Sequence, residues 1–221
     1  TSVQPAKRKQ TLQREGRDNR SKSHNLSRAE SKESSLSTPA AVQDSHLVTS
    51  CPMVSATDEL ASAVKAFQNQ ERIALDTEAD SLHCYFDKLC LIQISIPGSN
   101  FLIDPLSGLS LAPLFDSLEG KTVVIHSADY DLRLLRRSGY SGPTTLFDTM
   151  IAARLCGSLE FGLAALLHQH FGVTLAKASH KANWALRPLS QTMLEYAIND
   201  TLNLLQLAEI QEARLRELGR W

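Results

Sequence analysis

The sequence predicts a mixed α/β fold for the chain beyond residue 50, and two kinds of pattern support this class. Short apolar runs at residues 72–78 and 89–96 are typical of buried strands. Longer segments between and after them repeat apolar residues three or four positions apart, as amphipathic helices do. Since strands and helices alternate along the chain, we expect helices that pack on the faces of a sheet.

Each expected element ends at a break in the pattern. The predicted strands cover residues 72–78, 89–96, 101–104, 122–126 and 145–147. The predicted helices run from Ala56 to Gln70, over 111–118, from about 129 onward, over 148–155, over 159–171 and onward from Ser190. Gly157-Ser158 supplies a break and a cap between the two middle helices, and Gly172 ends the second of them.

The first 50 residues differ from the rest of the chain. They are rich in Ser, Lys, Arg, Gln and Asn and contain few apolar anchors. Such a composition buries too little surface to offset the entropy lost on ordering, so we predict a disordered N-terminal tail at residues 1–50 and a folded domain over residues 55–221. Lys7-Arg8-Lys9 fits a nuclear signal or a nucleic-acid contact, although a solvated polar tail is the simpler interpretation.

Length and composition exclude several classes of protein. A chain of 221 residues with 43% hydrophobic content fits one globular domain with an ample core. No apolar run approaches the ~18 residues of a membrane span, and no signal-peptide core follows the basic start, so we expect no membrane contact and an intracellular, most simply cytoplasmic, protein. The four cysteines lack the paired spacing of a zinc site, which predicts free thiols.

The charge is divided unevenly along the chain. Residues 1–50 carry a net charge of +4, whereas residues 51–221 carry −5. A negative domain argues against a broad nucleic-acid-coating surface, because phosphate affinity comes largely from basic side chains. Any contact with a nucleic-acid strand is therefore expected to be local and metal-assisted, with candidate contacts at Arg133, Arg136, Arg137, Lys177, Lys181 and Arg187.

Two pairs of residues have the spacing of a reactive site. Asp76 and Glu78 end a predicted strand and are two positions apart, so their side chains share a face. Tyr196 and Asp200 are four positions apart on the last predicted helix and lie on one stripe. Carboxylates are preferred ligands of Mg²⁺ and Mn²⁺, and acids that converge from distant segments suit phosphoryl transfer with paired metal ions.

A further carboxylate follows the predicted strand that ends at His126. Asp129 and Asp131 both stand there, and either suits a metal ligand while the other stabilises the start of the next helix. We expect a structural role for His126. Asp104 and Asp148 end apolar runs and are assigned to turns or caps.

In their order along the chain, these motifs resemble the DEDD superfamily of 3'-to-5' exonucleases, in the subgroup whose last motif is Tyr-x-x-x-Asp, and they are most similar to ribonuclease D. The stretch 76–82 also resembles the first motif of the proofreading exonuclease of DNA polymerase I. The resemblance implies a ribonuclease H-like mixed sheet with one antiparallel strand, flanked by helices. It covers roughly residues 55–218 and rests on Asp76-Thr77-Glu78, 89–94, 101–106, His126 with Asp131, Phe147-Asp148-Thr149, 184–189 and Tyr196 with Asp200.

The resemblance also implies a role for each site residue. It selects Asp131 over Asp129, and it makes four acids the ligands of two divalent ions, Mg²⁺ or Mn²⁺: Asp76, Glu78, Asp131 and Asp200. Asp76 would bridge both ions, and Glu78 would also lie close to the terminal sugar. Tyr196 would orient the attacking water. Thr77 and Leu82 are expected at the substrate, with Leu82 wedged against the last base.

The implied reaction releases nucleoside 5'-monophosphates from the 3' ends of single-stranded nucleic acid. Similarity to ribonuclease D favours RNA 3'-end trimming over the alternative, a DNA exonuclease of the Werner-helicase kind. A non-catalytic nucleic-acid-binding scaffold on the same fold is a further alternative. The presence of every ligand and of the tyrosine argues against it.

Overall fold

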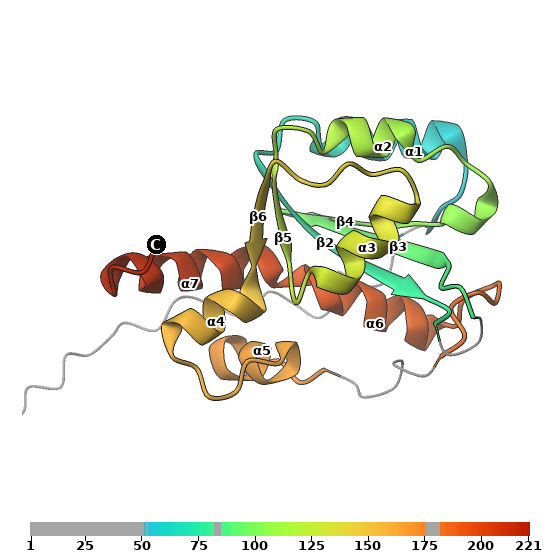
Figure 1. Cartoon of the computed structure of the whole chain (residues 1–221). Helices are drawn as coiled ribbons and strands as arrows, with labels where there is room; N and C mark the ends of the chain where they lie inside the picture. Colours follow the sequence, from blue (N-terminus) through green and yellow to red (C-terminus); the bar gives the residue numbers. More distant parts are fainter. Residues whose placement is uncertain (1–50, 52, 82–84, 176–181) are drawn as a thin grey trace, which may run out of the picture. The chain divides into compact units, whose positions relative to one another are not determined.

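The computed structural model describes residues 51, 53–81, 85–175 and 182–221. The predicted tail at residues 1–50, Leu82, Lys177 and Lys181 lie outside the described residues. The described strands form one six-stranded sheet in the order β1-β4-β3-β2-β5-β6 (Figure 1). These strands are Met53–Val54 (β1), Arg72–Ala79 (β2), Leu89–Ile96 (β3), Ser99–Ile103 (β4), Thr122–Ile125 (β5) and Thr145–Asp148 (β6).

One strand of this sheet runs against the others. β3 pairs antiparallel with β2 and with β4, whereas the β1–β4, β2–β5 and β5–β6 pairs are parallel. The tight connection between β3 and β4 passes through Gly98, whose φ of 79° is a left-handed conformation that glycine adopts without a steric penalty. The mixed sheet with a single antiparallel strand confirms the predicted fold class.

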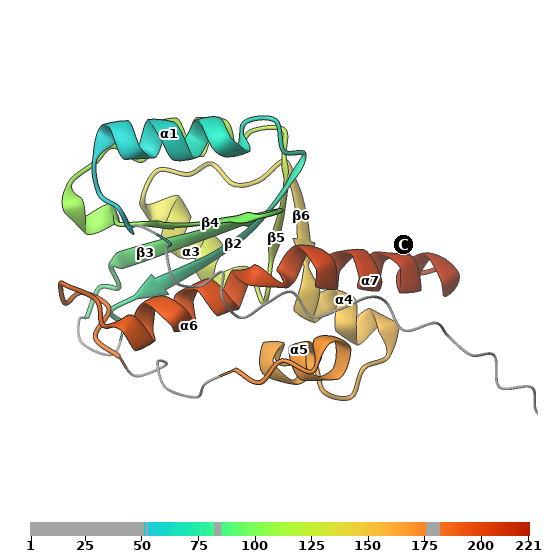
Figure 2. The same ribbon diagram turned by 180° about the vertical axis from the view of Figure 1, so that it is seen from behind.

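Helices cover both faces of the sheet (Figures 1 and 2). On one face, α1 (Thr57–Phe67), α2 (Ala112–Ser117) and α3 (Asp129–Arg137) bury their apolar side chains against Ile73 and Leu75 of β2. On the other face lie α4 (Thr149–Cys156), α5 (Leu163–Phe171), α6 (Gln191–Leu202) and α7 (Leu204–Glu217). Ala74 packs with α4, α5 and α7, and Leu91 of β3 packs with α6. The sheet therefore has a core on each side.

Three helix predictions were wrong at their boundaries. The first helix ends at Phe67, not at Gln70. The second middle helix begins at Leu163 after Gly162, not at residue 159, so Ser158 does not cap it. The predicted long C-terminal helix is two helices, because the chain leaves helical geometry at Asn203, where φ is −106° and ψ is 1°. The two-residue β1 and a short 3₁₀ helix, η2 (Pro105–Ser107), were not predicted. Both elements are too short to produce a periodic pattern.

The predicted turn or cap roles of Asp104 and Asp148 are confirmed. The Asp104 side chain accepts the Leu106 N–H at the start of η2, and Asp148 accepts the N–H groups of Met150 and Ile151 at the start of α4. Asp148 also accepts the N–H groups of residues 127 and 128, just before α3. One carboxylate thus satisfies donors at the starts of two helices.

Two expectations from composition can be compared with the described part of the chain. The cysteines described there, Cys51, Cys90 and Cys156, carry free thiols, as predicted. Each helix in those segments is too short or too polar to cross a membrane.

Candidate active site

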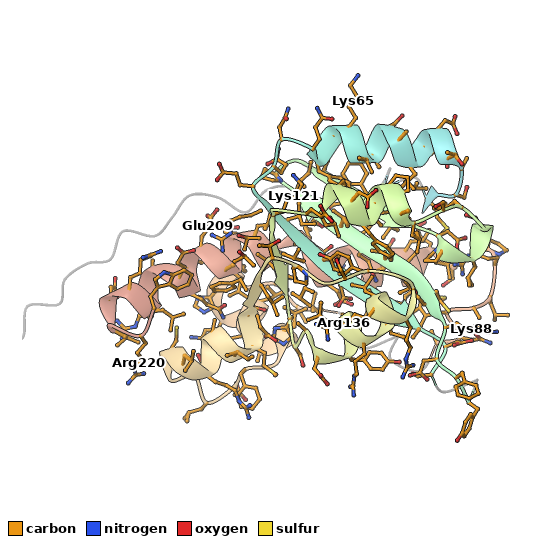
Figure 3. The ribbon with its side chains drawn as sticks, turned by 45° about the horizontal axis from the view of Figure 1, so that its top comes forward. Lys65, Lys88, Lys121, Arg136, Glu209 and Arg220 are labelled. Atoms are coloured by element: carbon orange, nitrogen blue, oxygen red, sulfur yellow. The ribbon has the colours of Figure 1, made fainter. Side chains whose placement is uncertain are left out.

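Asp76 and Glu78 lie where β2 runs past the end of β5. The last paired residues of these strands are Ala74 and Val124, so the parallel pairing stops before Asp76. Because side chains alternate along a strand, both acids share the face of Ala74, on the side of α4 to α7. Figure 3 shows Lys88 at this end of the sheet and Lys121 at the opposite end, where β5 begins.

Helix α6 brings the second predicted pair of residues to the same place. Ser190 begins the helix by accepting the Met193 N–H at 3.3 Å. Ala197 and Ile198 pack α6 against the sheet in a cluster that includes Leu91 of β3. Tyr196 and Asp200 are one turn apart, and the Tyr196 hydroxyl donates a hydrogen bond to the Asp200 carboxylate.

Arg187 anchors the segment that leads into α6. Its guanidinium donates to both carboxylate oxygens of Asp104, at 2.6 and 2.7 Å, and to the Cys90 carbonyl at 2.7 Å. It also donates to the carbonyls of Trp184 and Leu186, both at 2.8 Å. The guanidinium donates to protein acceptors in each of these contacts, so Arg187, one of the candidate strand contacts, holds the segment in place.

Three of the four predicted metal ligands converge. One carboxylate oxygen from each of Asp76, Glu78 and Asp200 lies within 4.8 Å of the others. These acids line a cavity of about 680 Å³, together with Asp131 and Tyr196. In the described segments, no other group of three or more acids, histidines or cysteines is close enough to hold an ion in common.

Asp131 reaches the cavity from α3, on the other side of the sheet. Its Oδ1 accepts hydrogen bonds from the Thr77 hydroxyl at 2.5 Å and from the Thr77 backbone N–H at 3.1 Å. Thr77, expected at the substrate, is itself buried and contacts this carboxylate. Asp129 instead points into solvent and pairs with Arg133 at 2.8 Å. Of the two acids, Asp131 is therefore the one that lines the cavity.

The acids in the cavity have strongly perturbed protonation equilibria. Burial raises the pKa of Asp76 well above its ordinary value, and repulsion from the other three acids adds to this effect. Burial and then repulsion from Asp200 and Asp131 raise the pKa of Glu78 to about 9. Burial likewise raises the pKa of Asp200 to about 7 and that of Asp131 to about 6. With a pKa of about 9, Glu78 in particular keeps its proton at neutral pH.

This donor set fits hard divalent cations. Four carboxylates face one cavity, and no Lys or Arg stands among its described lining residues. His126 also lines the cavity, but its Nδ1 lies 2.9 Å from the Thr149 hydroxyl, and burial lowers its pKa, which favours the neutral ring. Clustered carboxylate oxygens are the ligands that Mg²⁺ and Mn²⁺ prefer. A bound divalent cation would also remove the repulsion that raises these pKa values.

Sequence reasoning assigned no role to Trp184, which the structure places beside the site. Its side chain is buried and lines the cavity, and its ring centroid lies 6.2 Å from that of Tyr196. Trp184 stands in the motif that precedes α6, but spacing alone does not reveal that its ring supports the tyrosine. Leu82, the predicted base wedge, lies outside the described residues.

Comparison with known proteins identifies the family. A family model described as 3'-5' exonuclease matches residues 51–216. The chain belongs to the 3'-5' exonuclease family. This exonuclease-family chain is 36% identical over 175 residues to ribonuclease D of Jannaschia sp. (strain CCS1). That alignment covers 76% of this chain and 45% of the relative.

Solved exonuclease structures share the fold. The crystal structure of Escherichia coli RNase D, described as an exoribonuclease involved in structured RNA processing, matches with a TM-score of 0.73 and 32% identity, over 77% of this chain and 46% of that one. Brucella melitensis NrnC bound to pGG matches with a TM-score of 0.62 and 32% identity, over 69% and 77%. A structure of NrnC with bound Mg²⁺ matches with a TM-score of 0.61. This exonuclease-family chain spans less than half the length of the ribonuclease D relatives named here.

Proposed function

We propose that this chain is a metal-dependent 3'-to-5' exoribonuclease with residues 55–221 as its catalytic domain. The observation that carries the proposal is the convergence of Asp76, Glu78 and Asp200, whose oxygens lie within 4.8 Å of one another. Tyr196, hydrogen-bonded to Asp200 from one helical turn away, supports the subgroup whose last motif is Tyr-x-x-x-Asp.

The four acids have the composition of a site for two divalent cations. Asp76, Glu78, Asp131 and Asp200 would hold Mg²⁺ or Mn²⁺, which when bound acidifies water and stabilises a departing 3'-oxygen. Thr77 holds Asp131 in place from the sheet, so this acid is oriented before any ion arrives. The magnesium-bound structure of NrnC supports this class of ion.

Tyr196 is proposed to orient the attacking water. Burial, together with the negative charges of Asp200, Glu78 and Asp76, raises the pKa of its hydroxyl, so the hydroxyl keeps its proton at neutral pH. The proton is donated to Asp200, and the oxygen lone pairs remain able to accept a hydrogen bond from water. In-line attack of that water on the terminal phosphodiester would release a nucleoside 5'-monophosphate.

The rest of the strand would leave the cavity over the loop between β2 and β3. Tyr85 and Phe86 in this loop are 93% and 78% exposed, and their ring centroids lie 4.9 Å apart. The next residue, Asp87, accepts a hydrogen bond at 3.1 Å from the hydroxyl of Tyr130, which lines the cavity. The loop that carries the exposed rings is thus bonded to a residue that lines the cavity, and bases of a single strand that leaves the site are proposed to stack on these rings.

Exposed basic side chains lie near this loop and near Tyr130. Lys88, Arg133 and Arg137 have side chains that are 62%, 59% and 62% exposed. Arg133 pairs with Asp129, and Arg137 lies 4.0 Å from Asp87. Exposed ion pairs of this kind contribute little to stability, so the cations can turn to phosphates at small cost. Aromatic rings beside cations suit a single-stranded nucleic acid better than a duplex.

RNA is the proposed substrate because relatives of this chain are ribonucleases. The Jannaschia relative is a ribonuclease D, the E. coli structure is that of an exoribonuclease involved in structured RNA processing, and NrnC was solved bound to pGG. In this chain, no described contact identifies a sensor of the 2'-hydroxyl. Sugar preference therefore needs a direct comparison of RNA with DNA.

The test uses 5'-labelled single-stranded RNA and DNA of one sequence, incubated with the purified chain in Mg²⁺ or Mn²⁺. We expect products that shorten one nucleotide at a time from the 3' end, faster on RNA, with 5'-monophosphates released. Asp76→Asn is the inactive control. Undiminished cleavage in excess EDTA would exclude the metal mechanism, and faster cleavage of DNA would favour the DNA exonuclease.

A further inference from the structure

Gln93 is a buried amide that the proposed reaction does not use. It lies in the middle of β3 with no exposed surface, and neither its Oε1 nor its Nε2 has a hydrogen-bond partner among the residues that the structure describes. A buried polar side chain without a partner destabilises the folded state, and such groups are rare in native proteins. The stability of the fold therefore does not explain why a glutamine stands at position 93.

The sheet register places Gln93 directly beside Asp76. The two residues are opposite each other in the antiparallel β2–β3 pair. Side chains opposite each other in such a pair lie on the same face, with Cβ atoms roughly 4.5–5.5 Å apart. A Gln side chain is long enough to span that separation. Its amide is therefore within reach of the carboxylate that stands at the centre of the acid cluster.

The neighbouring polar groups on this face already have partners. Ser95, two residues along β3, has its hydroxyl 2.6 Å from that of Thr201 on α6 and bonds the Asn100 side chain at 2.7 Å. On its other side in the sheet, Gln93 is opposite Leu102, which is apolar. Asp76 is thus the cross-strand neighbour that offers Gln93 a charged acceptor.

We infer that Gln93 is a positioning residue: its Nε2–H₂ group donates to the Asp76 carboxylate when the acid cluster is ionised and holds a divalent cation. This inference rests on the proposed metal site. A carboxylate has more acceptor positions than one cation uses, and a buried donor on the remaining oxygen fixes its orientation. A buried amide opposite Asp76 would then be a donor placed in advance of the cation, as preorganised sites require.

The test compares Gln93→Met, which keeps the length and apolar volume of the side chain but removes the amide, with the parent. Metal-free melting temperature, Mn²⁺ affinity by calorimetry and single-turnover cleavage of RNA are measured. We expect the metal-free melting temperature to stay level or rise, since two unpaired buried atoms are removed. We expect Mn²⁺ affinity and the single-turnover rate each to fall about 10- to 100-fold.

Matched variants separate positioning from packing. Ser95→Ala, on the same strand and face but opposite Ala74 instead of an acid, should leave Mn²⁺ affinity unchanged even if it lowers the melting temperature. Gln93→Leu serves as a second apolar replacement if Gln93→Met does not fold. If either folded Gln93 variant has the Mn²⁺ affinity and cleavage rate of the parent, the role of Gln93 is wrong, but the proposed function stands because the parent still binds and cleaves. If the parent itself binds no Mn²⁺, both the role of Gln93 and the proposed function are wrong.

Discussion

Thr77 donates two hydrogen bonds to one oxygen of Asp131, from its hydroxyl at 2.5 Å and its backbone N–H at 3.1 Å. This contact joins β2 to α3, elements separated by 54 positions in the sequence. The hydrogen bonds favour the ionised carboxylate, although burial outweighs them and raises the pKa of Asp131 to about 6. Thr77 therefore orients an acid that approaches the cavity from the opposite layer.

The first prediction concerns this contact. Thr77→Val keeps the shape of the side chain but removes the hydroxyl donor, so it should lower the free energy of unfolding by about 1–3 kcal/mol. The cleavage rate should fall about 10- to 100-fold, as for other groups that orient a ligand. Thr77→Ser, which keeps the hydroxyl, is the control and should remain close to the parent. Chemical denaturation and single-turnover kinetics measure both effects; equal rates for Thr77→Val and the parent would contradict the role.

The second prediction separates two neighbouring acids. Asp131→Asn should lower the cleavage rate by several orders of magnitude, because Asp131 lines the cavity and would contribute a ligand. Asp129→Asn should retain most of the activity, since Asp129 is exposed and its pair with Arg133 is a surface ion pair. Both variants are assayed at saturating Mn²⁺. The opposite order of rates would show that Asp129 is the functional acid.

The third prediction concerns the hydroxyl of Tyr196. Tyr196→Phe keeps the ring that packs near Trp184 but removes the group proposed to orient water. Such groups typically contribute about 10²- to 10⁴-fold, so turnover should fall within that range while Mn²⁺ affinity survives. Asp200→Asn, one turn away, should lower both. If Tyr196→Phe cleaves at the parental single-turnover rate, Tyr196 acts in packing alone.

The fourth prediction is a pH dependence of stability without metal. Burial raises the pKa of Glu78 to about 9 and that of Asp200 to about 7, above the roughly 4 of these groups in an unfolded chain. Between these values the folded chain binds more protons than the unfolded chain, so its stability falls as the pH rises.

The measurement is the melting temperature in chelator from pH 5 to pH 9. We expect the melting temperature of the parent to decline over this range and that of Asp200→Asn to decline less steeply. In a second series without chelator, Mg²⁺ should raise the melting temperature of the parent. This rise should grow with pH because the cation binds the ionised acids. Asp129→Asn is the control and should follow the parent. A melting temperature that increases through this window would mean that the acids are already compensated by other groups.

The fifth prediction concerns the exposed rings of Tyr85 and Phe86. Replacing both with Ala should weaken binding of longer single strands, since stacking contributes about 1–3 kcal/mol per base. A dinucleotide, which ends within the cavity, should be cleaved with nearly parental kcat/KM. The ratio of kcat/KM for a decamer to that for a dinucleotide is the measurement. If kcat/KM falls equally for the decamer and the dinucleotide, the two rings act at the cavity and do not bind the longer strand.

Parts of the site depend only on local periodicity, and these could be predicted. The two-residue period of β2 puts Asp76 and Glu78 on one face whatever lies around them, and the helical period of α6 does the same for Tyr196 and Asp200. The caps at Asp104 and Asp148 are equally local, since each carboxylate accepts N–H groups two or three residues ahead. Short windows of sequence contain the physical cause of each of these features.

Long-range packing decided the rest. The end of α6 at Asn203, the partly buried pair of Arg187 and Asp104, and the place of Gln93 opposite Asp76 depend on segments far apart in the chain. The raised pKa values of the acids likewise arise from burial and mutual repulsion, which exist only once β2, α3 and α6 meet. The sequence by itself determined which residues face the same way within one element. The tertiary structure determined which elements meet, because distance and burial are properties of the whole packed domain.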